Sequence, residues 1–186
     1  MDSSSAEAVV EPRMLESFAT GDVDAFEALF RQYQGEVYRW IVRLVRNPGV
    51  AEELTVETFW RIYRHRTRFD ARRPFGPWAR RIASRVAIDY LKSNAYRESA
   101  GYFEPIGPRA QFSDRLEQAE TRDHIARAFL SLPVRLRVAA NLALIEELPY
   151  QEIANALDIS LSAVKMRVAR AAGLLRANLE KKGIRP

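Results

Sequence analysis

The chain has 186 residues and a mass of 21.3 kDa, with 47% hydrophobic and 28% charged residues, so it can bury a core and is not a disordered tail. The net charge is +5, and arginine supplies 25 of the 29 cationic residues. Because arginine makes planar, bidentate contacts with phosphate and guanine, this usage points to a nucleic-acid partner more than the net charge does, and an ordinary arginine-rich surface is the alternative. The absence of cysteine excludes disulfides, thiolate metal sites and a cysteine nucleophile.

The N-terminus carries acidic residues where a signal peptide would carry lysine or arginine. No apolar run approaches the roughly 18 residues that are needed to span a bilayer. We therefore expect a cytoplasmic protein without membrane insertion.

Charge and helix-breaking residues divide the chain into four segments. Residues 1–19 form an N-terminal extension with a net charge of −3, and residues 20–95 form a basic segment with a net charge of +5. Residues 96–122 carry a net charge of −1 and include two glycines and two prolines within eight residues, which indicates a linker. Residues 123–186 form a second basic segment with a net charge of +4. The pattern predicts two small domains joined by a flexible linker.

Apolar residues recur at steps of three or four in both basic segments, which predicts amphipathic helices. In the first segment one helix begins after Asp22, a candidate N-cap, and ends at residue 47; the next covers 50–64, and a third follows the loop 73–77. In the second segment we expect one helix over 116–130 and another that begins at Pro133 and ends near Glu146. No segment alternates with a period of two, so the predicted fold class is all-α.

Residues 150–170 have the spacing of a helix-turn-helix. Ile153 and Ala154 give the first helix an apolar face with a small residue at the helix crossing. Asp158 tolerates the left-handed conformation that the tight turn requires, and Ser160 can cap the second helix. The exposed face of that second helix combines cations with small residues and could enter a major groove. A plain αα-hairpin with solvated cations is the alternative.

These motifs resemble those of a known family. In the second segment the resemblance rests on Leu132-Pro133, on residues 148–154 (LPYQEIA), on residues 157–160 (LDIS) and on residues 164–171 (VKMRVARA). They resemble the C-terminal, promoter-reading domain of bacterial sigma factors, specifically the compact extracytoplasmic-function subgroup. In the first segment residues 26–38, 51–61 (AEELTVETFWR) and 75–91 (beginning FGPWARRIA) resemble the other domain of the same family. The resemblance covers roughly residues 20–94 and 125–180.

The resemblance implies a non-enzymatic specificity subunit of RNA polymerase that needs no cofactor. The N-terminal domain is expected to dock on the β′ clamp helices of the polymerase core and to open the −10 element of promoter DNA. The C-terminal domain is expected to read the −35 element and to contact the β flap. An anti-sigma factor is a usual partner in this family.

The resemblance also assigns candidate site residues. For the −35 element these lie on the second helix of the helix-turn-helix: Ser162, Ala163, Lys165, Met166, Arg167, Ala169 and Arg170. For the −10 element they lie in the loop and on the following helix, where aromatic and cationic side chains suit an unstacked base and a single-strand backbone: Arg72, Arg73, Phe75, Trp78, Arg81, Arg85 and Lys92. For polymerase docking they are Glu53, Leu54, Val56, Glu57 and Trp60, while Phe59 beside them is expected in the core.

Two other functions fit part of the sequence. A stand-alone helix-turn-helix transcriptional regulator would explain residues 125–180 but leaves residues 20–94 without a role. A helical nuclease or phosphohydrolase could use a metal held by Glu52, Glu53 and Glu57, but these glutamates lack the spacing of a hard-cation site. We therefore predict no catalytic residues and no metal site.

Overall fold

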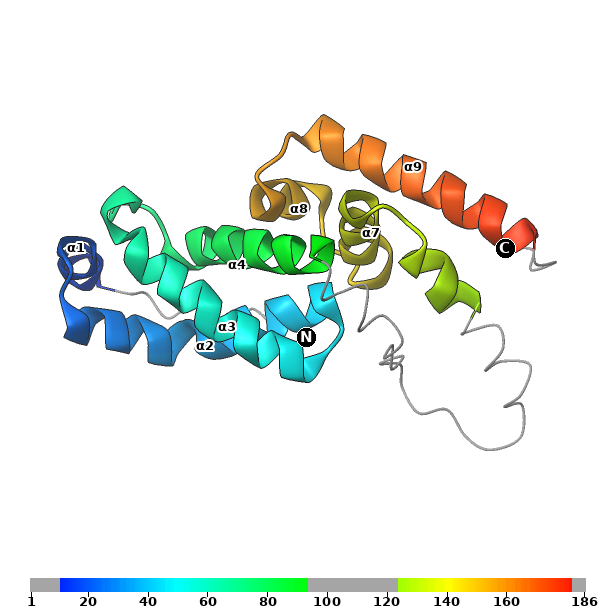
Figure 1. Ribbon diagram of the computed structural model, residues 1–186. Helices are drawn as coiled ribbons and strands as arrows, with labels where there is room; N and C mark the ends of the chain where they lie inside the picture. Colours follow the sequence, from blue (N-terminus) through cyan, green and yellow to red (C-terminus); the bar gives the residue numbers. More distant parts are fainter. Residues whose placement is uncertain (1–10, 94–123, 182–186) are drawn as a thin grey trace, which may run out of the picture.

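The computed structural model describes residues 11–93 and 124–181, and these residues form helices and connecting turns without any strand (Figure 1). The predicted all-α fold class is therefore confirmed. The helices form two blocks, α1–α4 and residues 124–181, and the first block carries the larger aromatic core. The proposed linker, residues 96–122, lies outside the described residues.

Two of the three long helices of the first block begin at capping residues that the sequence offers. Helix α2 (Val23–Val45) begins at Asp22, whose carboxylate accepts a hydrogen bond from the amide of Ala25 at 2.9 Å. Helix α3 (Pro48–Arg64) begins at Asn47, whose side chain accepts from the amide of Val50 at 3.1 Å. The cap at Asp22 confirms the start of the first predicted helix.

Helix α4 (Phe75–Lys92) packs against both α2 and α3. The alanines Ala79, Ala83 and Ala87 are all buried, and their small side chains allow the helices to approach closely. Where α2 crosses α4, the indole N–H of Trp40 donates to the hydroxyl of Ser84 at 2.9 Å, so this buried polar pair is satisfied. Helices α2, α3 and α4 therefore all pack against one another.

A further helix, α1 (Pro12–Thr20), lies within the stretch 1–19 that the sequence analysis treats as an extension. Its Leu15 and Phe18 are buried, and Phe18 contacts Phe26, Phe69, Phe75 and Trp78 with ring centroids 5.7 to 6.3 Å apart. The helix ends at Gly21, which adopts a φ of 103°. Helix α1 is thus part of the first block, and the boundary at residue 20 falls too late.

The second block contains a helical stretch over residues 124–130, then α7 (Val134–Ala140), the π-helical turn η2 (Asn141–Ile145), α8 (Tyr150–Leu157) and α9 (Leu161–Glu180). The helix expected between Pro133 and Glu146 is present, but its last turn is a π-helix. Apolar side chains from the 124–130 stretch, the turn after it, α7 and α9 pack into a small core: Ala128, Leu132, Ala140, Ala171 and Leu175.

The helix-turn-helix has the predicted turn. Asp158 follows α8 in the left-handed conformation, with φ 55° and ψ 51°. The Ser160 hydroxyl then accepts from the amide of Ala163 at 3.2 Å and caps α9. The aspartate and the serine therefore occupy the two positions for which their side chains are suited.

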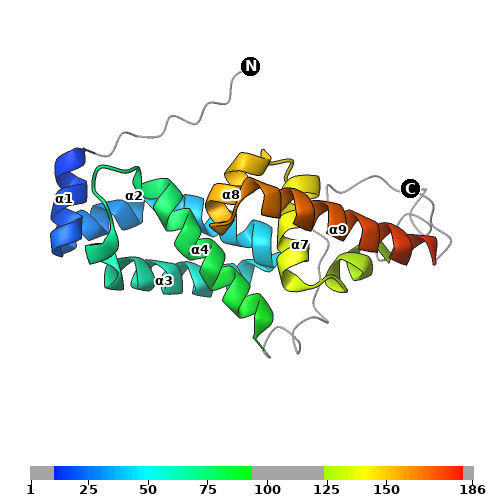
Figure 2. The ribbon, with the colours of Figure 1, turned by 90° about the horizontal axis from the view of Figure 1, so that it is seen from above.

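The two blocks lie against each other. Helix α8 lies beside α4, and the end of α2 lies beside η2 (Figures 1 and 2). The main buried cluster continues across this boundary, from Ala83 and Ala87 in the first block to Ile153 and Ala154 in the second. The helix-turn-helix consequently packs on the first block through its first helix.

If α1 is part of the fold, removing its buried aromatic ring should be costly. We expect Phe18→Ala to lower the free energy of unfolding by about 3–5 kcal/mol, because it opens a cavity among four aromatic rings. Urea denaturation followed by circular dichroism measures this change. The control Val23→Ala alters a side chain that is 64% exposed and should change stability by less than about 0.5 kcal/mol. Similar values for the two variants would contradict the role of α1.

Candidate nucleic-acid interface

The predicted −35 residues lie on the side of α9 that faces away from the core. Val164 and Val168 are buried against the second block, whereas Met166 is 64% exposed. The remaining predicted residues on this helix are exposed or half-buried: Ser162, Ala163, Lys165, Arg167, Ala169 and Arg170. The helix therefore presents these predicted residues together.

Lys165 and Arg170 are exposed cations, and neither forms an ion pair within residues 11–93 and 124–181. Lys165 lies about one turn and Arg170 about two and a half turns into α9, so both lie in the half of this helix that follows Ser160. An unpaired guanidinium keeps all of its donors available for an anionic or guanine partner. Within the described ranges, these two cations can therefore meet a partner without first breaking an ion pair.

Arg167 lies at the edge of this surface and is half-buried. Burial lowers its pKa, and the neighbouring charge of Arg135 on α7 lowers it further. In the described part of the chain, neither guanidinium has a carboxylate partner. Two like charges held together favour an anion beside them, and a DNA phosphate is such an anion.

The sequence analysis missed Arg135. The neighbouring Arg137 is 9% exposed and donates to the carbonyl of Leu130 at 3.2 Å, so one arginine of this pair is structural and the other is exposed. Their spacing of two residues places them on different sides of α7. The apolar pattern of this helix could have shown which arginine is buried and which is exposed, but it does not indicate that Arg135 lies beside Arg167.

The predicted −10 set contains one residue that the structure places elsewhere. Phe75 is only 1% exposed, and its ring packs against Phe18, Tyr33 and Phe69. It cannot stack on an extruded base while it remains in the core, so its assignment as a DNA contact is wrong. Trp78 is half-buried over the same aromatic cluster, with its ring centroid 4.8 Å from that of Phe69.

Arg72 and Arg73, in the loop before α4, have side chains that are 91% and 75% exposed. Both lie near the carboxylate of Asp70, at 3.0 and 3.6 Å. Hydrogen bonds from Arg72 lower the pKa of Asp70, so this residue stays anionic and compensates part of the loop charge. The two arginines nevertheless keep most of their surface in solvent.

The predicted cations Arg81 and Arg85 form a basic stripe on α4, but both already have hydrogen-bond partners. The Arg81 Nε donates to the carbonyl of Asn155 at 3.0 Å, and an Nη of Arg85 donates to the carboxylate of Asp158 at 2.5 Å. Both partners belong to the helix-turn-helix. Lys92, at the end of α4, is exposed and has no ion-pair partner in the described residues.

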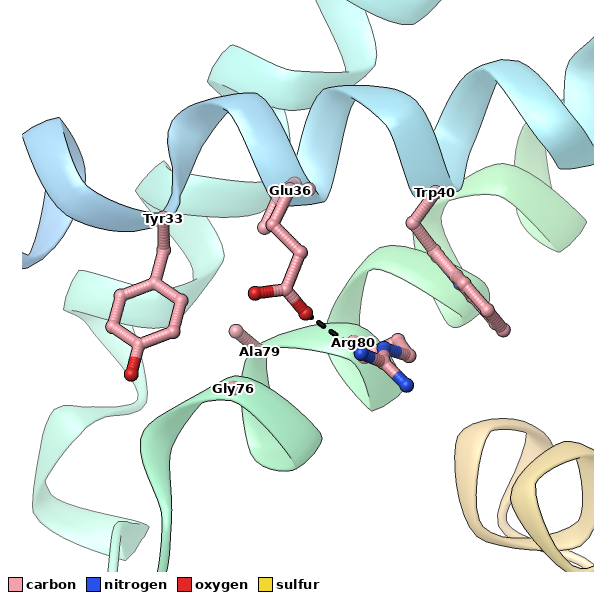
Figure 3. Close-up of a pocket in the computed structure, with 7 residues that line it drawn as sticks. Tyr33, Glu36, Trp40, Gly76, Ala79 and Arg80 are labelled. Atoms are coloured by element: carbon pink, nitrogen blue, oxygen red, sulfur yellow. Dashed lines mark hydrogen bonds and ion pairs between the residues drawn. The ribbon is translucent and has the colours of Figure 1, made fainter. Parts of the chain in front are cut away.

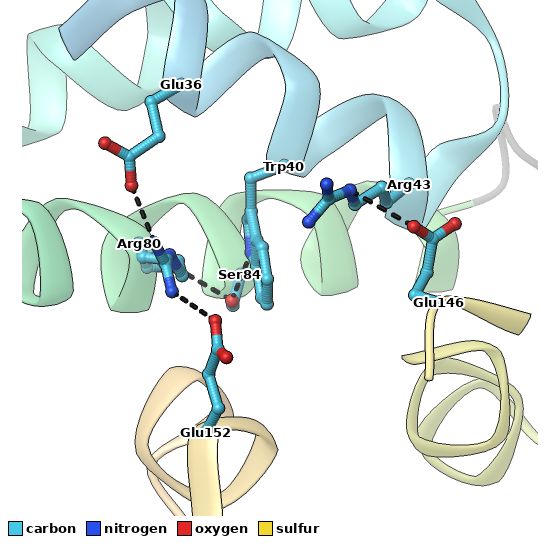
Figure 4. Close-up of polar contacts among 7 residues, drawn as sticks. All are labelled: Glu36, Trp40, Arg43, Arg80, Ser84, Glu146 and Glu152. Carbon is cyan, nitrogen blue, oxygen red and sulfur yellow. Dashed lines mark hydrogen bonds and ion pairs between the residues drawn. The ribbon is translucent and has the colours of Figure 1, made fainter. Parts of the chain in front are cut away.

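Arg80, one residue before this stripe, has the most partners. Its two Nη atoms donate to Glu36 on α2 at 2.7 Å and to Glu152 on α8 at 2.6 Å (Figure 4). Its guanidinium also lies 5.0 Å from the ring centroid of Trp40. Arg80 borders a shallow hollow between α2 and α4 that Tyr33, Glu36 and Gly76 also line (Figure 3).

The proposed docking residues on α3 form a partly apolar surface. Val56 and Trp60 are 66% and 54% exposed, and the guanidinium of Arg64 lies 5.1 Å from the Trp60 ring centroid. Phe59 is only 2% exposed, which confirms that it belongs to the core. The other proposed residues on this helix are exposed or half-buried: Glu53, Leu54 and Glu57.

Glu57 already has a partner. Its carboxylate accepts from Nε of Arg61 at 2.7 Å, and Arg61 also contacts Asp89 on α4 at 3.3 Å. The hydrogen bond from Glu57 is the main reason that the pKa of Arg61 is raised. A partner protein would therefore meet the acidic side of this helix chiefly at Glu53.

Within the described ranges, no group of three His, Asp or Glu side chains could hold a metal ion. Over the same ranges, every helix is too short or too polar to cross a membrane.

Comparisons with known proteins identify the family to which both blocks are similar. The family model described as Sigma-70 region 2 matches residues 29–97, and the model described as Sigma-70, region 4 matches residues 122–175. The ECF RNA polymerase sigma factor SigW of Bacillus subtilis is 31% identical over 170 residues, covering 86% of this chain and 91% of the relative. The RNA polymerase sigma factor CarQ of Myxococcus xanthus is 30% identical over 162 residues, covering 87% and 93%.

Solved structures share the fold. The structure of CnrH in complex with the cytosolic domain of CnrY has a TM-score of 0.55 and 24% identity, and the match covers 92% of this chain and 97% of that one. The sigma factor RpoE in complex with the anti-sigma factor NepR from Bartonella quintana has a TM-score of 0.51 and 19% identity, with coverage of 83% and 96%. The chain therefore belongs to the extracytoplasmic-function subgroup of the sigma-70 family and is a sigma factor that directs promoter-specific transcription.

Proposed function

We propose that α9 reads the −35 element from the major groove. The observation that carries this proposal is the exposed face on which Lys165 and Arg170 have no acidic partner in the described residues. Arg170 can bind a guanine through two N–H donors. Met166, which lies between the two cations in sequence, can contact an apolar base edge. Arg167 and Arg135 would contact the phosphate backbone beside the groove.

The first block would bind the polymerase core and the −10 element. Exposed Val56 and Trp60 on α3, with Glu53 beside them, offer an apolar anchor and a charge for the β′ clamp helices. The −10 strand would lie along the loop and α4, where the proposed contacts are Arg72, Arg73, Trp78, Arg81, Arg85 and Lys92. Phe75 would support Trp78 from below.

The division of labour follows the segments of the sequence. Residues 20–95, together with α1, would act at the polymerase clamp and the −10 element, and residues 123–186 at the −35 element and the β flap. Residues 96–122 would join them. The chain would act in the cytoplasm as a non-catalytic subunit.

We also propose an anti-sigma factor as a partner. Two proteins that share this fold were solved with partners, and one of these complexes is by name a sigma factor with an anti-sigma factor. Such a partner would have to cover the DNA-facing surfaces.

Transcription in vitro tests the whole proposal. Bacterial core polymerase with this chain should initiate at specific sites in a promoter library, and core alone should not. A stand-alone helix-turn-helix regulator would bind DNA without recruiting core. It would also leave the exposed apolar surface of α3 without a role.

Arg170 and Arg135 should have different effects on promoter binding. We expect Arg170→Ala to weaken binding to the best −35 sequence by about 1–3 kcal/mol and to flatten the preference at one base position. Arg135→Ala should weaken all sequences alike and reduce the salt slope by about one unit, because it removes a phosphate contact. Binding to a panel of −35 substitutions at several salt concentrations distinguishes them. If Arg170→Ala leaves the order of preference among the −35 bases unchanged, Arg170 does not read the base sequence.

Trp60 should matter for polymerase binding and not for folding. We expect Trp60→Ala to lower affinity for core by more than about tenfold, since it removes an aromatic anchor, while the melting temperature changes little because the ring is half in solvent. Fluorescence titration with core measures the affinity. Val23→Ala, an exposed apolar residue away from α3, is the control. Equal affinities for wild type and Trp60→Ala would place docking elsewhere.

A further inference from the structure

Helix α3 ends in an exposed cation that lies outside the predicted set of docking residues. Arg64 is the last residue of this helix, and its guanidinium lies over the ring of Trp60, 5.1 Å from the ring centroid. We propose that Arg64 is a further polymerase contact, which pairs with an acidic side chain of a clamp helix while Glu53 pairs with a basic one. This inference rests on the proposed docking of α3 on the polymerase core.

Arg64 lies on the same face of α3 as the proposed docking residues. At about 100° per residue, four exposed residues fall within about 80° of one another around the helix axis: Glu53, Val56, Trp60 and Arg64. We call these four residues the docking stripe. A partner that contacts Val56 and Trp60 along the helix would therefore reach Arg64 as well.

The two ends of the docking stripe carry free charges of opposite sign. Neither Glu53 nor Arg64 forms an ion pair within residues 11–93 and 124–181. Glu57, which lies between them, is bound by Arg61, and Arg61 also contacts Asp89 on α4. The stripe therefore offers a partner one free acid and one free base about three helical turns, or roughly 16 Å, apart. Two exposed apolar side chains lie between these charges.

The contact with Trp60 holds Arg64 without using its hydrogen-bond donors. A guanidinium that lies over a ring keeps its N–H groups in its own plane, where they can still donate to a carboxylate. Arg66 shows the contrast, because it lies 4.5 Å from the ring centroid of Tyr63 and also donates to the carbonyl of Tyr63 at 3.0 Å. In the described part of the chain, Arg64 has no such hydrogen bond. Its donors are therefore both positioned and available.

A helix is the partner shape that matches the docking stripe. A second helix that packs nearly along α3 can contact a straight stripe over about three turns. It would need a base opposite Glu53 and an acid opposite Arg64. A partner helix that runs in the reverse direction would place like charges together at both ends, which costs binding free energy. The two charges therefore select one direction of the clamp helix as well as one partner.

Affinity for core polymerase in the absence of DNA tests the role of Arg64. Fluorescence titration of the full chain with core should show that Arg64→Gln lowers the affinity on the order of fivefold. Arg64→Lys should lower it by less, because lysine keeps the charge and loses the planar fork. The melting temperatures should stay near that of the wild type, since the side chain is exposed. Arg13→Gln on α1 is the matched control, because Arg13 is also exposed and has no ion pair in the described residues.

Charge reversal identifies the partner acid. Arg64→Glu should lower the affinity by more than about tenfold, because it places like charges together. Replacing one acid of the clamp helices by lysine should restore much of this loss. Glu53→Lys should be restored by a different change, the replacement of a base by glutamate about three turns from that acid on the same clamp helix.

The outcomes separate the role of Arg64 from the proposed docking. Equal affinities of wild type and Arg64→Gln for core would overturn the contact, and so would a failure of every acid-to-lysine change to restore Arg64→Glu. A loss of affinity for promoter DNA with unchanged affinity for core would also overturn it, because Arg64 would then belong to the DNA surface. Trp60→Ala is measured in parallel. If only Trp60→Ala weakens binding, the docking proposal stands and the role of Arg64 is wrong; if neither variant does, both are wrong.

Discussion

The guanidinium of Arg80 lies where α2, α4 and α8 meet, and a largely buried cation at such a junction needs counter-charge from more than one helix. Glu36 supplies it from α2 and Glu152 from α8, while the ring of Trp40 covers one face. Because Trp40 is in turn fixed by Ser84 on α4, the cation, the ring and the hydroxyl form one connected group. This group, together with the apolar contacts between α4 and α8, holds the helix-turn-helix against the first block.

Helix α4 therefore packs against the core with one side and against the second block with another. Its alanine-rich side packs into the core, and its arginine-rich side meets the second block. The start of the helix is held by an aromatic cluster in which Phe75 is buried and Trp78 is half-buried. The start of α4, where Trp78 is proposed to bind a base, gains a rigid support from this cluster, since the ring beneath cannot move without opening the core.

Features that depend on local chemistry could be predicted from the sequence. The spacing of apolar residues predicts the long helices, and the capping residues Asp22 and Ser160 predict where two of them begin. The left-handed turn at Asp158 is predicted from the residue type. Helix α1 was missed because nine residues contain too few turns for a clear period, although Phe18 anchors it. The burial of Phe75 was missed because a loop aromatic looks the same in sequence whether it faces DNA or the core.

The choice of partner for each arginine could not be predicted, because it depends on helices that are distant in sequence. Arg85 and Asp158 are 73 residues apart, and only the packing of α8 on α4 brings them together. The same packing leaves Lys165 and Arg170 on α9 without acidic partners in the described residues. The two proposed DNA surfaces thus differ in their starting state: α9 can accept duplex DNA directly, whereas α4 has to exchange carboxylates for phosphates. If both surfaces act as proposed, duplex contacts through α9 would form before α4 holds the opened strand.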